Sequence, residues 1–297
     1  MNIRFKAWLQ ILRPANIITA IADSWAGMII ASSTAPMLHF NGINGLALSL
    51  SSACLYGGGV VLNDAFDLET DKLERPERPI PKGLIAPGMA FFVAFALLIS
   101  GILLAWANSR QSAILALVLS GVIVLYDSLA KKNKWTGPFV MGTCRSLNLL
   151  LGISLIPSAL EPMAVFGVFP LLYIAAITAV SRGEVHGGRK TAQLLAFFLY
   201  ATVIMGVFGY GFYYKTIGIE QVGIFLALFS GFVVTPLYDA WQSPSPANIR
   251  NAVKRGVIGI IALDACYASL FTGWLSACII LLLMPIAIWV GKKLAVT

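Results

Sequence analysis

Long apolar runs separated by short polar stretches dominate the chain. A helix needs about 20 predominantly apolar residues to cross a bilayer, and eight runs of this kind precede the C-terminal region. They lie near residues 17–34, 45–63, 88–107, 111–130, 138–157, 163–181, 194–214 and 220–238. No polar stretch between them is long enough to form a soluble domain. The pattern predicts one all-α, membrane-embedded domain over residues 1–297.

The two ends of the chain leave alternatives. A final apolar run, residues 256–291, is too long for one upright helix and is interrupted at Gly273. It predicts a ninth span followed by either a tenth span or a tilted extension. At the N-terminus, Arg4 and Lys6 precede an apolar run as in a signal peptide. That run has the length of a full span and no clean small-residue cleavage site, so we expect a retained first span.

Composition agrees with a membrane protein. The chain is 58% hydrophobic and 11% charged, whereas soluble domains have roughly 45–50% apolar and about 25% charged residues. The net charge of +8 is typical of nucleic-acid binders only where Lys and Arg form exposed stripes on a polar domain. Here the basic residues lie between apolar runs. We therefore expect the lipid bilayer as a partner, and no nucleic acid.

The basic residues also predict an orientation. Counting the loops alternately places 17 of the 21 Lys and Arg residues on one side, and Arg110 and Lys215 on the other. Lys292 and Lys293 join the first side only if there are ten spans. Cytoplasmic loops carry the excess of Lys and Arg, so the N-terminus and the polar loops on the first side are predicted to face the cytoplasm.

Acidic residues concentrate at the end of the second span. Within fourteen residues lie six of the thirteen acids: Asp64, Asp67, Glu69, Asp71, Glu74 and Glu77. If the helix continues, Asn63, Asp67 and Asp71 fall at i, i+4 and i+8 on one face, with Asp64 on the flank. Such oxygen ligands repel one another unless a cation lies between them.

Mg²⁺ suits this arrangement, because it binds a few carboxylates and completes its coordination with water and substrate phosphates. Arg75, Arg78 and Lys82 follow immediately and could hold the same phosphates. The alternative is a solvated charged loop with helix-surface pairs such as Asp71 with Arg75. Charge is scarce in this chain and the run adjoins a membrane helix, which favours the functional interpretation.

Residues 63–83 resemble the first signature of the UbiA superfamily of intramembrane prenyltransferases. The matching residues are Asn63-Asp64-x-x-Asp67-x-x-x-Asp71, followed by Arg75-Pro76-x-Arg78-Pro79-Ile80-Pro81. Further matches are Arg13-Pro14-x-Asn16, Tyr126 with Lys131, and Gly142-x-Cys144-Arg145-x-x-Asn148. The resemblance implies nine helices, possibly ten here, around a lipid-open cavity. It also implies Mg²⁺-dependent transfer of a prenyl group from a diphosphate to an acceptor, usually aromatic.

The resemblance assigns roles to individual residues. Asn63, Asp67 and Asp71 would bind Mg²⁺ and diphosphate, with Asp64 alongside. Arg78 and Lys131 would hold phosphate; many members have the lysine four residues after the tyrosine, whereas Lys131 is five after Tyr126, which leaves Lys131 or Lys132 open. The remaining candidate substrate-binding residues are Asn16, Asp64, Lys82, Tyr126, Arg145, Asn148 and Arg182.

The second acidic motif of the superfamily departs from its pattern. The loop 181–191 contains no aspartate, and Glu184 stands in the place of one. Glu184 and His186 are candidate catalytic residues, as metal ligands or as the base, while a structural role is the alternative for His186. The stretch 182–188 resembles the EboC-like branch of bacterial gene clusters. That resemblance implies a bacterial inner membrane protein with partners from the same cluster.

These observations favour a Mg²⁺-dependent prenyltransferase acting on a prenyl diphosphate and an aromatic or lipid-like acceptor, with Asp67 and Asp71 in catalysis. The weakened second motif supports an alternative, a non-catalytic membrane component that binds or helps to export a lipid-like or aromatic metabolite. An ion-coupled transporter is disfavoured, because most polar candidates lie near the cytoplasmic ends of the spans.

Overall fold

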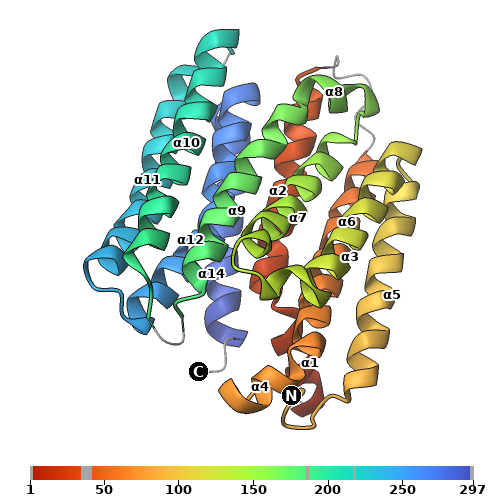
Figure 1. Ribbon diagram of the computed structural model, residues 1–297. Coiled ribbons are helices and arrows are strands. Elements are labelled where there is room, and N and C mark those ends of the chain that lie inside the picture. The colour runs from red at the N-terminus through yellow and green to blue at the C-terminus, as the bar shows by residue number, and fades with distance from the viewer. Residues whose placement is uncertain (1–2, 35–41, 185–186, 217–218, 295–297) are drawn as a thin grey trace.

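The structure, a computed structural model, describes residues 3–34, 42–184, 187–216 and 219–294, and in these ranges the regular elements are all helical. Long helices run up and down in one bundle, with α1 (Ile3–Leu12) and α4 (Leu68–Glu74) at the same end (Figure 1). The other helices of the N-terminal half are α2 (Pro14–Ser32), α3 (Gly42–Phe66), α5 (Pro87–Trp106), α6 (Arg110–Ser128) and α7 (Thr136–Ile153).

The C-terminal half continues the bundle. It contains α8 (Leu160–Met163), α9 (Val168–Ser181), α10 (Lys190–Tyr214), α11 (Ile219–Gln242), α12 (Pro246–Thr272), α13 (Trp274–Leu281) and α14 (Leu283–Leu294). Short 3₁₀ turns occur at Ala130–Lys132, Pro157–Ala159 and Ala164–Gly167.

The local sequence explains where α12 begins. Ser245 caps α12 by accepting a hydrogen bond from the Asn248 N–H, and Pro246 occupies the first turn, where its missing N–H costs nothing.

The predicted membrane architecture is confirmed. Within the described residues, nine helical segments are long and apolar enough to cross a membrane. α7 is a further helix of 18 residues, less apolar because it carries Arg145 and Asn148, and it packs between α2, α6 and α9. The final apolar run divides at Gly273, whose φ of 89° suits glycine. Trp274–Lys293, which comprises α13 and most of α14, is itself one of the nine candidate spans, so the run forms two separate spans rather than one span with a tilted extension.

α2 and α12 lie inside the bundle and hold it together. α2 packs against α3, α7, α12 and α14, and α12 against α2, α9, α11 and α13. Glycines allow the closest approach: a Cβ at Gly152 of α7 would lie 2.2 Å from the Ser24 carbonyl oxygen of α2, and one at Gly27 of α2 would lie 2.3 Å from the Leu149 carbonyl oxygen. Small residues at such crossings are typical of membrane helix packing.

The outer helices expose large apolar side chains. Phe92 and Leu103 on α5, Phe198 and Phe212 on α10, and Trp289 on α14 are more than half exposed. In water such a surface would aggregate, whereas lipid chains cover it without cost. The chain is a multi-pass membrane protein whose polar residues are concentrated inside the bundle and at one end.

Candidate active site

The acidic motif lies where α3 leaves the bundle. α3 and α4 are separated by one residue, Asp67, yet the Asp67 N–H bonds to the Asn63 carbonyl at 3.0 Å and the Asp71 N–H to the Asp67 carbonyl at 2.8 Å. Asn63, Asp67 and Asp71 therefore remain on successive turns, as the i, i+4, i+8 spacing predicts. Asp64 and Asp71 are buried, and the Asp67 side chain is 30% exposed.

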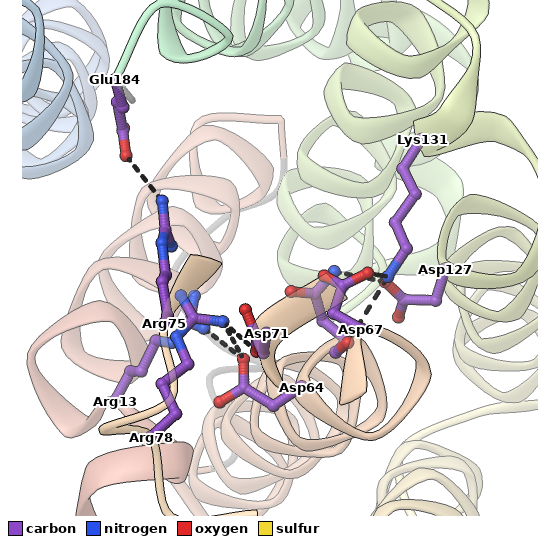
Figure 2. Close-up of polar contacts among 10 residues, drawn as sticks. Arg13, Asp64, Asp67, Asp71, Arg75, Arg78, Asp127, Lys131 and Glu184 are labelled. Carbon is purple, nitrogen blue, oxygen red and sulfur yellow. Dashed lines mark hydrogen bonds and ion pairs between the residues drawn. The ribbon is translucent and has the colours of Figure 1, made fainter. Parts of the chain in front are cut away.

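Basic residues from three parts of the chain meet these carboxylates (Figure 2). Arg78 Nη1 lies 2.7 Å from Asp71 Oδ2 and 3.4 Å from Asp64 Oδ1. Arg13, between α1 and α2, also pairs with Asp64. Burial lowers the pKa of Arg78, but Asp64 and Asp71 outweigh this effect and raise its pKa above the usual value. Arg78 is therefore a permanently charged group between two carboxylates.

Lys131 pairs with Asp67, the carboxylate of the motif that Arg78 does not contact. Its Nζ lies 2.7 Å from Asp67 Oδ1 and 3.6 Å from Asp127 Oδ1 (Figure 2). Asn63 donates a hydrogen bond of 2.8 Å to the same Asp127 oxygen. Lys132 is exposed, so the lysine that the structure brings to the acidic motif is Lys131.

A cavity of about 240 Å³ adjoins the motif between α3, α6 and α7. We call it the first cavity. Its polar lining includes Arg13, Asn63, Tyr126, Arg145 and Asn148, and its apolar lining comes from residues such as Leu119, Ile123 and Met141. Tyr126, Arg145 and Asn148, which the family resemblance gives as candidate substrate-binding residues, thus line one cavity. The acidic motif lies at the edge of this cavity.

Arg145 and Asn148 also belong to a fully internal network. Arg145 Nη1 lies 2.7 Å from Asp23 Oδ2, and its Nη2 donates to Thr19 at 2.7 Å. Asn148 donates to the Ala20 carbonyl at 2.9 Å and accepts from Ser52 at 2.7 Å. The sequence places Arg145 among the candidate substrate-binding residues, and it names no particular residue of the protein as a partner for it. The partner found is Asp23, which lies inside the first membrane helix.

A second cavity, of about 520 Å³, opens at the same end of the bundle between the α1–α2 junction, α12 and α14. Asn16 and Glu184 line this cavity, and Arg13 lines both cavities. Glu184 Oε2 lies 3.7 Å from Arg75 Nη2. Burial raises the pKa of Glu184, against the opposite effect of Arg75 and Arg250, so its carboxylate takes up a proton more readily than an ordinary glutamate.

Comparison with known proteins places this geometry in a family. A family model, the UbiA prenyltransferase family, matches residues 21–252. The chain belongs to the UbiA prenyltransferase family. Similar proteins include digeranylgeranylglyceryl phosphate synthases from Methanothrix thermoacetophila, 35% identical over 48% of this chain and 52% of the relative, and from Thermococcus kodakarensis, 33% identical over 50% and 52%. The chain spans about half the length of these relatives.

Solved structures share the UbiA fold across most of the chain. A structure of a digeranylgeranylglyceryl phosphate synthase has a TM-score of 0.65 at 22% identity and covers 90% of this chain and 98% of its own. A UbiA homologue from Archaeoglobus fulgidus bound to GPP and Mg²⁺ has a TM-score of 0.65 at 15% identity, covering 88% and 99%. At these identities the likeness shows the fold. The EboC-like branch within the UbiA family stays a prediction.

The donor set at the UbiA motif fits Mg²⁺ in kind. In the described part of the chain, no three His, Cys, Asp or Glu side chains gather around one point, because Asp64 and Asp71 share Arg78 while Asp67 turns to Lys131. Mg²⁺ needs only one or two carboxylates when substrate phosphates supply further oxygens. Asp67 and Asp71, on consecutive turns beside Arg78 and Lys131, meet that requirement.

Three candidate residues lie apart from this motif. Lys82 is exposed on a turn and forms no ion pair among the described residues. The Arg182 guanidinium donates a hydrogen bond of 2.7 Å to the Asn133 carbonyl and so holds the backbone that follows Lys131 in place. His186 lies outside the described residues. Arg182 therefore contacts the site indirectly, through the backbone near Lys131.

Two residues outside the candidate set belong to the site of this UbiA-family chain. Arg13 adopts a left-handed backbone, φ 48°, which is uncommon for residues other than glycine, and its side chain pairs with Asp64. Asp127 joins Asn63 to Lys131. The Arg13-Pro14 pair matches the family pattern and could have identified Arg13 from the sequence. Nothing in the sequence around Asp127 distinguishes it from other acidic residues at helix ends.

Proposed function

We propose that this chain transfers a prenyl group from a prenyl diphosphate to an acceptor within the membrane. The observation that carries the proposal is the arrangement of Asp64, Asp67 and Asp71 against Arg78 and Lys131 at the edge of the first cavity. Membership of the UbiA prenyltransferase family supports it. The solved relatives bound to Mg²⁺ and prenyl diphosphates have the same fold.

In this proposal the diphosphate exchanges partners with existing ion pairs. Arg78 and Lys131 are held in place by carboxylates and offer charged N–H donors to phosphate oxygens, the strong class of hydrogen bond. Asp67 and Asp71 would hold Mg²⁺, which neutralises diphosphate charge when bound. The apolar wall formed by Leu119, Ile123 and Met141 receives the start of the prenyl chain.

Heterolysis of the bond between the prenyl C1 and the diphosphate oxygen leaves the electron pair on the diphosphate. Arg78 and Lys131 stabilise the charge that develops there, which is the main catalytic contribution expected of preorganised charges. The allylic cation is then captured by a nucleophilic atom of the acceptor, which loses a proton. We assign that proton to Glu184, whose raised pKa makes it a stronger base than an ordinary glutamate.

A lipid-like acceptor bearing a glycerol phosphate is favoured over a neutral aromatic one. The similar proteins from Methanothrix thermoacetophila and Thermococcus kodakarensis are digeranylgeranylglyceryl phosphate synthases by name. An acceptor of this class carries a hydroxyl as the nucleophile and an aliphatic body that stays in the bilayer.

The test is incubation of purified protein with Mg²⁺, labelled prenyl diphosphates of increasing length, and a panel of lipid and aromatic acceptors. Release of diphosphate and a labelled lipid product is expected, and both should disappear in Asp67→Asn. Glu69→Gln is the matched control, because Glu69 lies in the same motif but pairs with Lys72 on the exposed surface. Mg²⁺-dependent binding of the diphosphate without turnover on any acceptor would instead favour a non-catalytic membrane component.

We also propose that the end carrying the acidic motif faces the cytoplasm in a bacterial inner membrane. The excess of Lys and Arg on that side supports it. Reporter fusions after Lys132 and after Arg110, active only on one side of the membrane, should give opposite signals. Equal signals from the two fusions would contradict the orientation.

A further inference from the structure

The second cavity differs in charge from the first. Its lining includes four cations, Arg13, Arg250, Lys254 and Lys292, and one carboxylate, Glu184. Arg13 pairs with Asp64, and Glu184 faces Arg75. Within the described part of the chain, Arg250, Lys254 and Lys292 form no ion pair. Arg250 acts on the Glu184 carboxylate only at longer range, so none of the three cations has an anion in direct contact among the described residues, and we call this space the basic cavity.

Most of the remaining lining of the basic cavity is apolar, with Gln10 and Asn16 as its uncharged polar residues. Val253, Val257 and Ile258 of α12 and Ile288 and Val290 of α14 line it beyond the charged residues. Such a cavity matches a molecule with an anionic head and an aliphatic body. A small soluble anion would leave the apolar wall in contact with water, and a neutral lipid would form no charge-assisted hydrogen bond with the cations.

Neighbouring basic residues supply a contrast within the same helices. Lys293 lies over the Trp289 ring at 4.1 Å, and Arg255 lies over the Phe232 ring at 5.4 Å, and neither lines the basic cavity. Lys292 and Lys254, one residue before each, do line it. The positive charge in the cavity is therefore placed by specific positions of α12 and α14, and not by a general excess of lysine and arginine at this end.

The basic cavity also adjoins the acidic motif. Arg13 lines both cavities, and its guanidinium pairs with Asp64 of the motif. Glu184, on the lining of the basic cavity, pairs with Arg75, three residues before Arg78. A lipid whose head lies in the basic cavity would thus present its nearby hydroxyl close to both Glu184 and the diphosphate-binding residues.

We propose that Arg250, Lys254 and Lys292 bind the phosphate monoester head of a single-chain glycerol phosphate lipid, and that this contact selects the acceptor. The inference rests on the proposed prenyl transfer, which it deepens by assigning the acceptor its own binding site. The dianionic monoester meets three cations, and the aliphatic chain lies along the wall formed by α12 and α14. The diphosphate of the other substrate stays at the acidic motif.

The test uses the full chain in phosphatidylcholine nanodiscs. Oleoyl lysophosphatidic acid is the probe, because it has a phosphate monoester, one chain and a free hydroxyl. Monooleoylglycerol lacks only the phosphate, and glycerol phosphate lacks only the chain. The Kd of each is measured for the wild type, for Arg250→Gln, Lys254→Gln and Lys292→Gln, and for the matched controls Arg255→Gln and Lys293→Gln. The three cavity cations are at the exposed edge of the bundle, so these variants should fold.

We expect the phosphate lipid to bind at least about tenfold more tightly than either partial probe, since hydrogen bonds to charged groups and the buried chain both contribute. Each cavity variant should weaken its binding about tenfold, while the controls stay near the wild type. In the transfer assay, the cavity variants should raise the KM for the lipid acceptor and leave the KM for the prenyl diphosphate unchanged.

Equal loss of affinity in the cavity variants and the controls would overturn the assignment, as would binding of glycerol phosphate as tight as that of the lipid. A KM increase for the prenyl diphosphate would place the cations in the other substrate site and also overturn it. Selective binding that depends on the three cations, with no transfer under any condition, would refute the proposed function and leave the phosphate-lipid site standing.

Discussion

Two charged clusters occupy the N-terminal half of the bundle, and they differ in what surrounds them. The acidic motif at the end of α3 pairs Asp67 with Lys131 and Asp71 with Arg78, and the Asp67 side chain is 30% exposed. The internal network pairs Arg145 with Asp23, whose side chains are 6% and 1% exposed. In the proposed function the first cluster exchanges its partners with a substrate, whereas the second cluster is closed off from solvent.

The difference follows from where the partners are attached. Arg78 lies on the connection between α4 and α5, and Lys131 lies on the short 3₁₀ turn that follows α6, both at the polar end. Arg145, Asp23 and Asn148 lie within α7 and α2, where carbonyl and hydroxyl groups satisfy the remaining donors. Charge inside a membrane protein is tolerated when its partners are fixed. The internal network therefore orders the helices, and the acidic motif retains the freedom to bind a ligand.

Breaking the internal pair should have the largest effect on stability. Arg145→Met leaves Asp23 without its cation, and removing one partner of a buried pair costs about 3–5 kcal/mol. Thermal unfolding in detergent should show a large decrease in Tm. The double variant Asp23→Leu/Arg145→Met should recover part of it, because no uncompensated charge remains from the pair. A single variant as stable as the wild type would remove the structural role assigned to Arg145.

Asp71→Asn should affect activity far more than stability. Loss of one preorganised charged group in an active site lowers kcat on the order of 10²–10³-fold, whereas Arg78 keeps Asp64 as a partner, so the Tm should change less than in Arg145→Met. Prenyl transfer and Tm are measured on the same preparation. A large decrease in Tm without a selective loss of kcat would make the acidic motif structural, like the internal network.

Gly152→Ala tests the close packing that supports the internal network. The new methyl group would lie 2.2 Å from the Ser24 carbonyl of α2, and overpacking typically costs about 1–3 kcal/mol. Gly121→Ala on α6 is the control, because a Cβ there meets nothing within 4 Å and alanine favours a helix by up to about 1 kcal/mol. The two variants should shift Tm in opposite directions; a shared direction would contradict the tight α2–α7 crossing.

Arg75→Gln should have the smallest effect and should appear in the pH profile. Arg75 opposes the rise in the pKa of Glu184 that burial causes. Without Arg75, Glu184 keeps its proton to a higher pH. The acid limb of the pH profile of kcat/KM therefore shifts to higher pH, and the rate at pH values well above this limb is unchanged. A partly exposed pair contributes about 0.2–1 kcal/mol, so the rate should fall about fivefold or less at acidic pH. Glu184→Gln, which lacks the titrating group, should lose this limb.

The sequence predicted the helices and the acidic motif because both depend on residues close together in the chain. Each apolar run formed a helix, and Asn63, Asp67 and Asp71 remained on successive turns despite the break at Asp67. The sequence left open whether the ninth span is followed by a tenth span or by a tilted extension. The structure divides the last apolar run at Gly273, whose positive φ allows the chain to reverse.

Partners distant in the chain were harder to foresee. Asp23 is 122 residues from Arg145, and no periodicity links them; only the α2–α7 crossing brings them together. Lys131 and Lys132 are equivalent candidates in the sequence, and the structure separates them because Lys131 turns toward Asp67 while Lys132 is exposed.

By itself, the sequence determined a multi-pass helical protein with its acidic chemistry at one end of the second span, because hydrophobic length and helical spacing are local properties. The tertiary structure decided which cation meets each carboxylate and brought Arg13, Arg250, Lys254 and Lys292 to the lining of one cavity. The physical reason is that electrostatic interactions depend on distance in space, and helix packing sets those distances.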